Sequence, residues 1–156
     1  GSTSIPGWTT TDNGAEWFPP TVYGYANSPN GGHIVDLACY TYTAGGVKQT
    51  FATIPGMTYV VTFYLGTHAV SGRDGTCSIV VSADGTTQTY SHTSLTAQIG
   101  WVSQTFSFVA DDASATLMFR CLQNANLHFA YIDGAGVSMP VGVEATTWGL
   151  IKALYR

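Results

Sequence analysis

The chain has 156 residues, of which 45% are hydrophobic and 9% are charged, and its formal net charge is −4 at pH 7. This hydrophobic content excludes a disordered chain, and five scattered basic residues exclude a patch that neutralises a run of phosphates, so nucleic acid is not expected as a partner. No apolar run approaches the roughly 20 residues of a membrane-spanning helix, so membrane insertion is not expected either.

The first 32 residues are rich in Pro, Gly and Asn, which is typical of irregular surface structure. They also carry several aromatic residues, and an aromatic side chain in a loop is either pinned onto the core or displayed to a partner. We expect Trp8 and Trp17 to be pinned onto the core. Tyr23 and Tyr25 alternate, which favours one face shown to solvent.

The stretch that organises the rest of the chain is 45–66, in which the alternating runs 47–53 and 59–65 flank Pro55-Gly56. Period-two alternation of β-branched and aromatic residues predicts strands. Because Pro presets φ and Gly supplies a positive φ, the dipeptide predicts a turn, and the two runs predict a two-stranded antiparallel unit. Further strands are predicted at 33–37, 76–82, 86–90, 101–109, 115–121 and 129–139.

A second turn signal is Asp84-Gly85, which lies between two of these runs and predicts a tight hairpin. About eight strands at turn-punctuated intervals, with no helix between them, predict an all-β fold. We expect an antiparallel jelly-roll β-sandwich that spans residues 1–139 as one domain.

Residues 140–156 differ in character and are expected to form a separate tail. Thr146 or Thr147 can cap a short helix. Its apolar side chains are Trp148, Leu150, Ile151, Leu154 and Tyr155. A helix this short is marginal alone, so the tail is expected to dock or to mediate assembly.

The three cysteines, Cys39, Cys77 and Cys121, have spacings that fit no zinc site. Cys77 and Cys121 lie in predicted strands and can pair as a disulfide, which would leave Cys39 for a bond to another chain. The alternative is that all are buried free thiols.

An ordered set of motifs carries a family resemblance. The set is Ile5-Pro6-Gly7-Trp8, 34–37, 46–51, 54–59, 100–108 and Tyr131-Ile132-Asp133. In this order, over roughly residues 5–138, it resembles the bacterial choice-of-anchor C or DUF642-like secreted proteins. The resemblance implies a galactose-binding-like jelly roll, an extracellular or cell-surface location and no established catalysis. It also implies that related sandwiches bind polysaccharide, often with a structural calcium ion.

Two departures from the family pattern bear on these expectations. The family usually opens with a strand of the type Asn-Gly-(Ser/Asp)-Phe-Glu, and no such strand precedes Gly1. The closing strand reads Ile132-Asp133-Gly134-Ala135, where the family commonly has a second polar residue after the aspartate. Asp133 is the one residue that we assign to a calcium site, and no other cofactor is expected.

Enzymatic activity is not expected. A glycoside hydrolase needs two carboxyl groups at a defined separation, and nothing in the sequence brings Asp36 and Asp133 together. There is also no Gly-x-Ser-x-Gly nucleophile motif.

Two non-catalytic functions remain. The favoured one is an extracellular structural or adhesive subunit, which self-assembles into a homo-oligomer or filament through its tail and the sheet edge that a missing first strand would leave open. The alternative is a monomeric module that binds cell-wall or extracellular polysaccharide. Its sugar-stacking side chains would be Tyr23, Tyr25, Tyr40 and Tyr42, and alternation puts the last two on one side of a strand.

Overall fold

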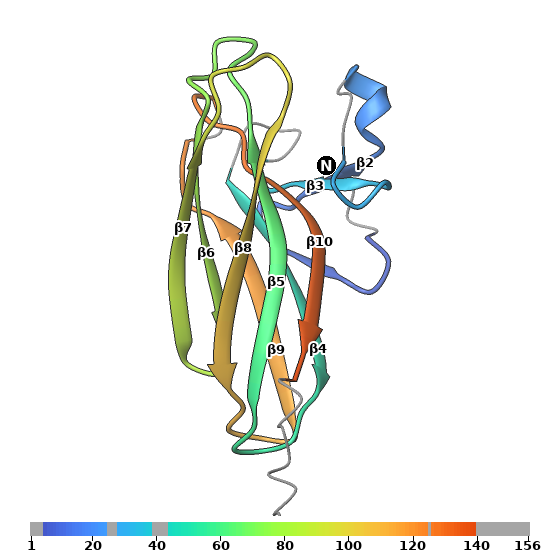
Figure 1. The fold of residues 1–156 in the computed structure, drawn as a ribbon, viewed down its shortest axis with the longest axis vertical. Helices are drawn as coiled ribbons and strands as arrows, with labels where there is room; N and C mark the ends of the chain where they lie inside the picture. Colours follow the sequence, from blue (N-terminus) through green and yellow to red (C-terminus); the bar gives the residue numbers. More distant parts are fainter. Residues whose placement is uncertain (1–4, 25–27, 39–43, 125, 140–156) are drawn as a thin grey trace, which may run out of the picture.

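The computed structural model describes residues 5–24, 28–38, 44–124 and 126–139 as a sandwich of two five-stranded antiparallel sheets (Figure 1). The first sheet has the order β1 (Thr9–Asp12), β4 (Gly45–Ala52), β9 (Ser114–Cys121), β6 (Thr76–Ala83) and β7 (Thr86–Thr93). The second has the order β2 (Glu16–Phe18), β3 (Ile34–Asp36), β10 (Tyr131–Ser138), β5 (Thr58–Thr67) and β8 (Gly100–Val109). A 3-10 helix, η1 (Pro20–Tyr23), follows β2. The predicted all-β jelly-roll sandwich is confirmed.

The core lies between the sheets and follows from the alternation of each strand. Val61, Phe63 and Leu65 of β5 point inward and are fully buried, while Thr62 and Tyr64 between them are exposed. The ring of Phe63 meets Phe119 of the facing sheet edge-on, with centroids 5.0 Å apart. Burial of each such side chain stabilises the fold by about 1.5–3 kcal/mol.

The predicted antiparallel unit of residues 45–66 is wrong, because β4 and β5 belong to different sheets. β4 pairs with β9 and β1, whereas β5 pairs with β8 and β10. The turn at Pro55-Gly56 exists, with Gly56 at φ 79°, but the chain crosses there from one layer to the other. The N–H of Gly56 bonds to the carbonyl of Ala110 in the connection that leaves β8. Alternation identifies a strand but does not identify its partner.

The predicted hairpin at Asp84-Gly85 is confirmed. β6 pairs with β7 up to Ala83 and Thr86, and the two turn residues have φ values of 44° and 73°. Positive φ at both positions defines the type I′ turn that suits the twist of a two-residue hairpin.

Two strands within the loop-rich start of the chain were not predicted. β1 is a run of three threonines and an aspartate without apolar alternation, and β2 has only three residues. β1 pairs with Gly45–Lys48 of β4 and so fills part of the sheet edge that was expected to be open. The described structure therefore gives no support to assembly through a wholly open edge.

Cys77 and Cys121 are buried free thiols, so the disulfide expected between them is absent. Ile79, not Cys77, is the partner of Cys121 across β6 and β9, which makes the cysteines diagonal neighbours. Diagonal positions lie about 7–8 Å apart, beyond the Cα separation of roughly 4.4–6.8 Å that a disulfide spans. Burial raises the pKa of Cys77 to about 12.

The tail at 140–156 lies outside the described residues, and with it the expected helix and the side chains Trp148, Leu150, Ile151, Leu154 and Tyr155. Docking of this tail stays a prediction. Within the described ranges, the structure holds no helix with the length and apolar character to cross a membrane.

Candidate functional site

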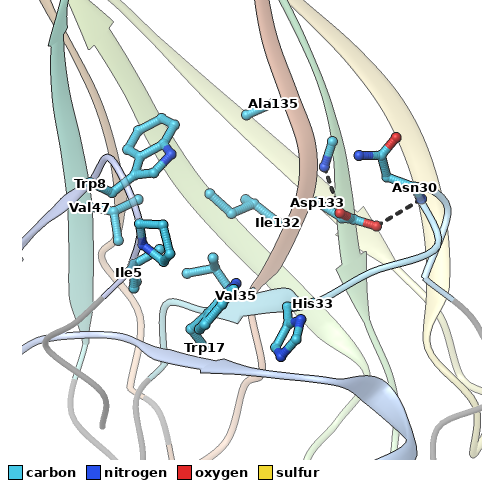
Figure 2. A pocket seen from close by; sticks show the side chains of 12 residues that line it. Ile5, Trp8, Trp17, Asn30, His33, Val35, Val47, Ile132, Asp133 and Ala135 are labelled. Atoms are coloured by element: carbon cyan, nitrogen blue, oxygen red, sulfur yellow. Dashed lines mark hydrogen bonds between the residues drawn. The ribbon is translucent and has the colours of Figure 1, made fainter.

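A hollow of about 230 Å³ opens beside the core, where the β2–β3 ribbon meets the first described turn of the chain and the start of β10. Trp8 and Trp17 lie on two sides of it, so we call it the Trp8–Trp17 hollow (Figure 2). Its polar side chains come from His33, Asn30 and Asp133, and none of the described residues that line it is Lys or Arg. The hollow thus combines flat apolar rings with a small number of polar groups.

Strand alternation in the β2–β3 ribbon points Trp17 into the hollow. Phe18 and Ile34, on the opposite face of the ribbon, are buried in a second small apolar cluster with Tyr131. Trp17 pairs in register with Val35, and its ring stacks on His33 with centroids 4.0 Å apart and planes inclined by 20°. His33 is exposed and Trp17 is half-buried, so the stacked pair, which lines the hollow, reaches the protein surface (Figure 2).

A tight turn holds Trp8 on the other side. The N–H of Trp8 donates to the carbonyl of Ile5 at 3.0 Å, and Gly7 supplies the positive φ of 78° that the turn needs. The ring of Trp8 packs on Phe119, with centroids 5.9 Å apart. The prediction that Trp8 and Trp17 are pinned to the core is confirmed, and each of them also lines the hollow.

Asp133 fastens the loop that forms the third side. Its Oδ2 accepts hydrogen bonds from the Ser28 hydroxyl at 2.6 Å and the Asn30 N–H at 3.0 Å, and its Oδ1 accepts one from the Gly134 N–H at 2.7 Å. A β-bulge begins directly after Asp133 and turns Gly134 and Ala135 toward the hollow. In the described part of the chain, no three His, Cys, Asp or Glu side chains lie close enough to share a metal ion. The calcium site at Asp133 stays a prediction.

Of the four tyrosines predicted to stack on sugars, Tyr25, Tyr40 and Tyr42 lie outside the described residues. Tyr23 ends η1 and is 47% exposed. Its hydroxyl donates to Glu16 at 2.8 Å and its ring meets Phe18 edge-on, so it packs on the side of Phe18 and does not line the hollow.

No local sequence motif marks Trp17, His33 or Asn30 as a binding site. The alternation of Trp17 with Phe18 was the available signal, because neighbouring aromatics on a strand must face opposite sides. The pairing of β2 with β3, which brings His33 onto Trp17, was not readable from local pattern.

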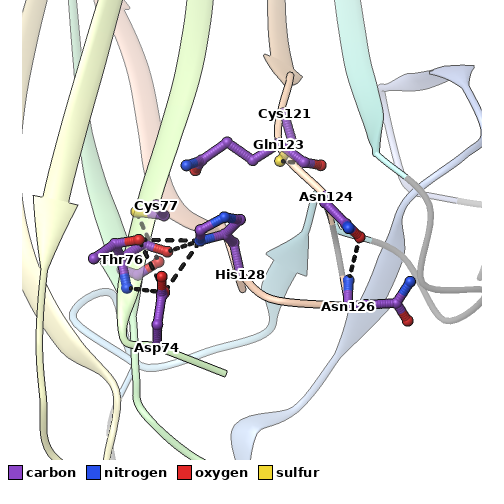
Figure 3. A network of polar contacts seen from close by, with 9 residues as sticks. Asp74, Thr76, Cys77, Cys121, Gln123, Asn124, Asn126 and His128 are labelled. Atoms are coloured by element: carbon purple, nitrogen blue, oxygen red, sulfur yellow. Dashed lines mark hydrogen bonds and ion pairs between the residues drawn. The ribbon is translucent and has the colours of Figure 1, made fainter. Parts of the chain in front are cut away.

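A second polar cluster lies at Asp74, Thr76 and His128 (Figure 3). The Nδ1 atom of His128 is 3.1 Å from the Asp74 carboxylate and 3.0 Å from the Thr76 hydroxyl. Hydrogen bonding from the Thr76 N–H lowers the pKa of the exposed Asp74 carboxyl. These contacts join the loop before β6 to the loop before β10, and we interpret the cluster as structural.

Comparison with known proteins places this geometry in context. The model of a family described as Protein of unknown function (DUF642) matches residues 1–131. No curated protein matches.

Several solved structures share the fold. TmCBM61 in complex with β-1,4-galactotriose is 12% identical, with a TM-score of 0.58 over 85% of this chain and 88% of that chain. The CBM22-1 xylan-binding domain of Xyn10C from Paenibacillus barcinonensis is 13% identical, with a TM-score of 0.54 over 85% of each chain. An exo-β-1,3-galactanase from Phanerochaete chrysosporium is 13% identical, with a TM-score of 0.55 over 85% of this chain but 28% of its own. Identities this low show the fold alone.

Proposed function

The chain belongs to the family described as Protein of unknown function (DUF642), and on that premise we propose that it is a carbohydrate-binding module that recognises a neutral polysaccharide through the Trp8–Trp17 hollow. The observation that carries the proposal is the stack of the half-buried Trp17 ring on the exposed His33 ring, beside the loop that Asp133 holds. The carbohydrate ligands and carbohydrate-binding names of the structural neighbours support the same class of function.

The chemistry of the hollow suits a sugar ring. A pyranose has faces of C–H groups, which pack on aromatic rings, and a rim of hydroxyls, which need hydrogen-bond partners. The Trp17 ring offers the first, and the exposed polar groups of His33 and Asn30 offer the second. A volume of about 230 Å³ is below the roughly 300–1,000 Å³ of small-molecule pockets, so the hollow suits about one ring of a longer chain.

The charge of the hollow favours a neutral glycan. Its described residues include the Asp133 carboxylate and no Lys or Arg. A uronate would meet a negative charge without a compensating cation in a partly desolvated site, which is unfavourable.

The proposal gives the protein a non-catalytic role and a location outside the cell or on its surface, where polysaccharides are available. It replaces the self-assembling fibre that the sequence favoured. Assembly through a wholly open sheet edge has no support in the described structure, because β1 covers the first half of β4.

Affinity electrophoresis tests the proposal with gels that contain β-1,4-galactan, xylan or polygalacturonate. We expect one of the neutral polymers to retard the protein and polygalacturonate not to do so. Trp17→Ala removes a stacking surface worth about 1.5 kcal/mol, so binding should weaken roughly tenfold or more. Trp17→Phe should retain part of the affinity.

The control is Leu95→Ala, which removes an exposed apolar side chain between β7 and β8 that does not line the hollow and should leave binding unchanged. Circular dichroism should confirm that each variant is folded. Mobility unchanged in all neutral polymers, or equal losses for Trp17→Ala and Leu95→Ala, would overturn the proposal.

A further inference from the structure

A second hollow, of about 400 Å³, adjoins the first and shares two of its residues, Trp8 and Ala135. It lies between the two sheets on the side where β4 and β10 face each other. Besides Trp8, its aromatic residues are Phe51 and Tyr59, and we call it the Phe51–Tyr59 hollow. Together the two hollows follow one side of the sandwich, with Trp8 between them.

This side of the sandwich also carries strand edges with unused hydrogen-bonding groups. β1 pairs with β4 only at Gly45–Lys48, and β3 pairs with β10 only at Tyr131 and Ile132. Among the described residues, Gln49–Ala52 and Gly136–Ser138 therefore have a strand partner on one side only. No described strand pairs with these two segments on their outer side, and Gln49, Phe51, Ala52 and Val137 of these segments line the Phe51–Tyr59 hollow.

We propose that the two hollows are consecutive parts of one cleft, which binds an internal stretch of a polysaccharide chain rather than a single terminal sugar. This inference rests on the proposed function and extends it from one sugar ring to the next. One sugar ring packs on Trp17 and His33, and the polysaccharide continues past Trp8 so that a following sugar ring lies against Phe51.

The residues of the second hollow match the two kinds of surface that a sugar presents. Phe51 is half-buried and keeps part of its ring accessible, while Phe108 packs against it from the core with centroids 6.4 Å apart. The Gln49 amide lies in the same hollow, next to the Trp8 turn, since a Cβ on Gly7 would be 3.2 Å from Gln49 Nε2. Gln49 and the free strand edges supply the hydrogen bonds that sugar hydroxyls need.

Within the described ranges, exposed residues lie at both ends of the cleft. The first hollow opens toward exposed residues at His33 and Asn30, and the second opens toward Val137 and Met139, which are 40% and 44% exposed. A polysaccharide can therefore extend beyond the cleft at both ends, which is the geometry that binding of an internal stretch requires.

Isothermal titration with β-1,4-galacto- and β-1,4-xylo-oligosaccharides, from the monosaccharide to the hexasaccharide, tests the inference. Affinity should rise by about tenfold when the oligosaccharide becomes long enough to fill the second hollow, since one further sugar–aromatic stack is worth about 1.5 kcal/mol. Val137→Arg places a long side chain in the second hollow from an exposed position and should abolish this gain while short oligosaccharides bind as before.

Val109→Arg is the matched control, because Val109 is an exposed strand valine that lines neither hollow. An affinity that is already maximal for the shortest ligand, or a gain with length that Val137→Arg leaves intact, would overturn the inference and leave the proposed function standing. Absence of binding by every oligosaccharide and polymer would instead remove the proposed function itself.

A variant that ends at Met139 checks whether the chain's own C-terminal segment fills the second hollow. The gain with length should be the same in this variant as in the full chain. A gain that appears only after residues 140–156 are removed would overturn the inference.

Discussion

Asp133→Ala should both destabilise the fold and weaken polysaccharide binding, because this carboxylate ties the loop at 28–32 to β10. The substitution removes the three hydrogen bonds that Asp133 accepts, from the Ser28 hydroxyl and from the N–H groups of Asn30 and Gly134. Hydrogen bonds to a charged acceptor each contribute about 1.5–3 kcal/mol to stability.

The full sum of those contributions is not expected. Asn30 is exposed and Ser28 is half-buried, so water can reach both donors once the carboxylate is gone. Water replaces part of the lost energy, and we expect a loss of about 2–4 kcal/mol in the free energy of unfolding. With a urea m-value of about 2 kcal/mol/M, the unfolding midpoint should fall by roughly 1–2 M.

Urea titration followed by tryptophan fluorescence measures this change. Asp112→Ala is the matched control, since Asp112 also accepts a main-chain hydrogen bond, at 2.6 Å, but only from the next residue in an exposed turn. It should shift stability by less than about 0.5 kcal/mol. Equal midpoints for Asp133→Ala and the unsubstituted protein would refute the reasoning that this carboxylate holds the loop.

Two further predictions concern titratable groups away from the hollow. The Arg120 guanidinium lies 2.7 Å from the Asp12 carboxylate and lowers the pKa of that carboxyl. The ion pair therefore stabilises the fold fully above the unfolded-state pKa of about 3.8. This stability is lost as the pH falls through the lower pKa of the folded state. Because both side chains are about one-third exposed, Arg120→Ala should lower the free energy of unfolding by less than about 1 kcal/mol at pH 7 and should leave it unchanged in strong acid. An equal loss of stability at both pH values would contradict this. In a Cys39→Ser variant, Cys77 and Cys121 should resist labelling by a thiol reagent at pH 8 until urea unfolds the protein, since burial raises the pKa of both thiols. Rapid labelling of the folded protein would contradict this prediction.

Local pattern was sufficient for most strands, and the reason is physical. A strand in a sandwich has one face in the core, so residues such as Val61 and Phe63 must alternate with polar ones. The Asp84-Gly85 hairpin was also readable, because its two positive φ values are a property of the residues themselves. β1 and β2 were missed because short strands at a sheet edge need no apolar face.

Which strands pair with each other could not be predicted from local sequence pattern in the same way. The Pro55-Gly56 turn looks alike in sequence whether the next strand returns beside the first or crosses to the other sheet. In the structure β5 forms a register with β8 from Thr58 and Val109 to Thr67 and Gly100. A run of hydrogen bonds between distant segments decided the outcome, and no local window contains that information.

By itself, the sequence determined that this protein is an all-β sandwich with a type I′ hairpin and tryptophans packed against its core, because alternation, turn chemistry and aromatic burial are local consequences of residue type. Only the tertiary structure decided where a ligand can bind. The Trp8–Trp17 hollow exists because β2 pairs with β3, which stacks His33 on Trp17, and because Asp133 reaches back across the chain to hold Ser28 and Asn30. Contacts between residues about 100 positions apart in sequence depend on the whole fold, and the site they build does too.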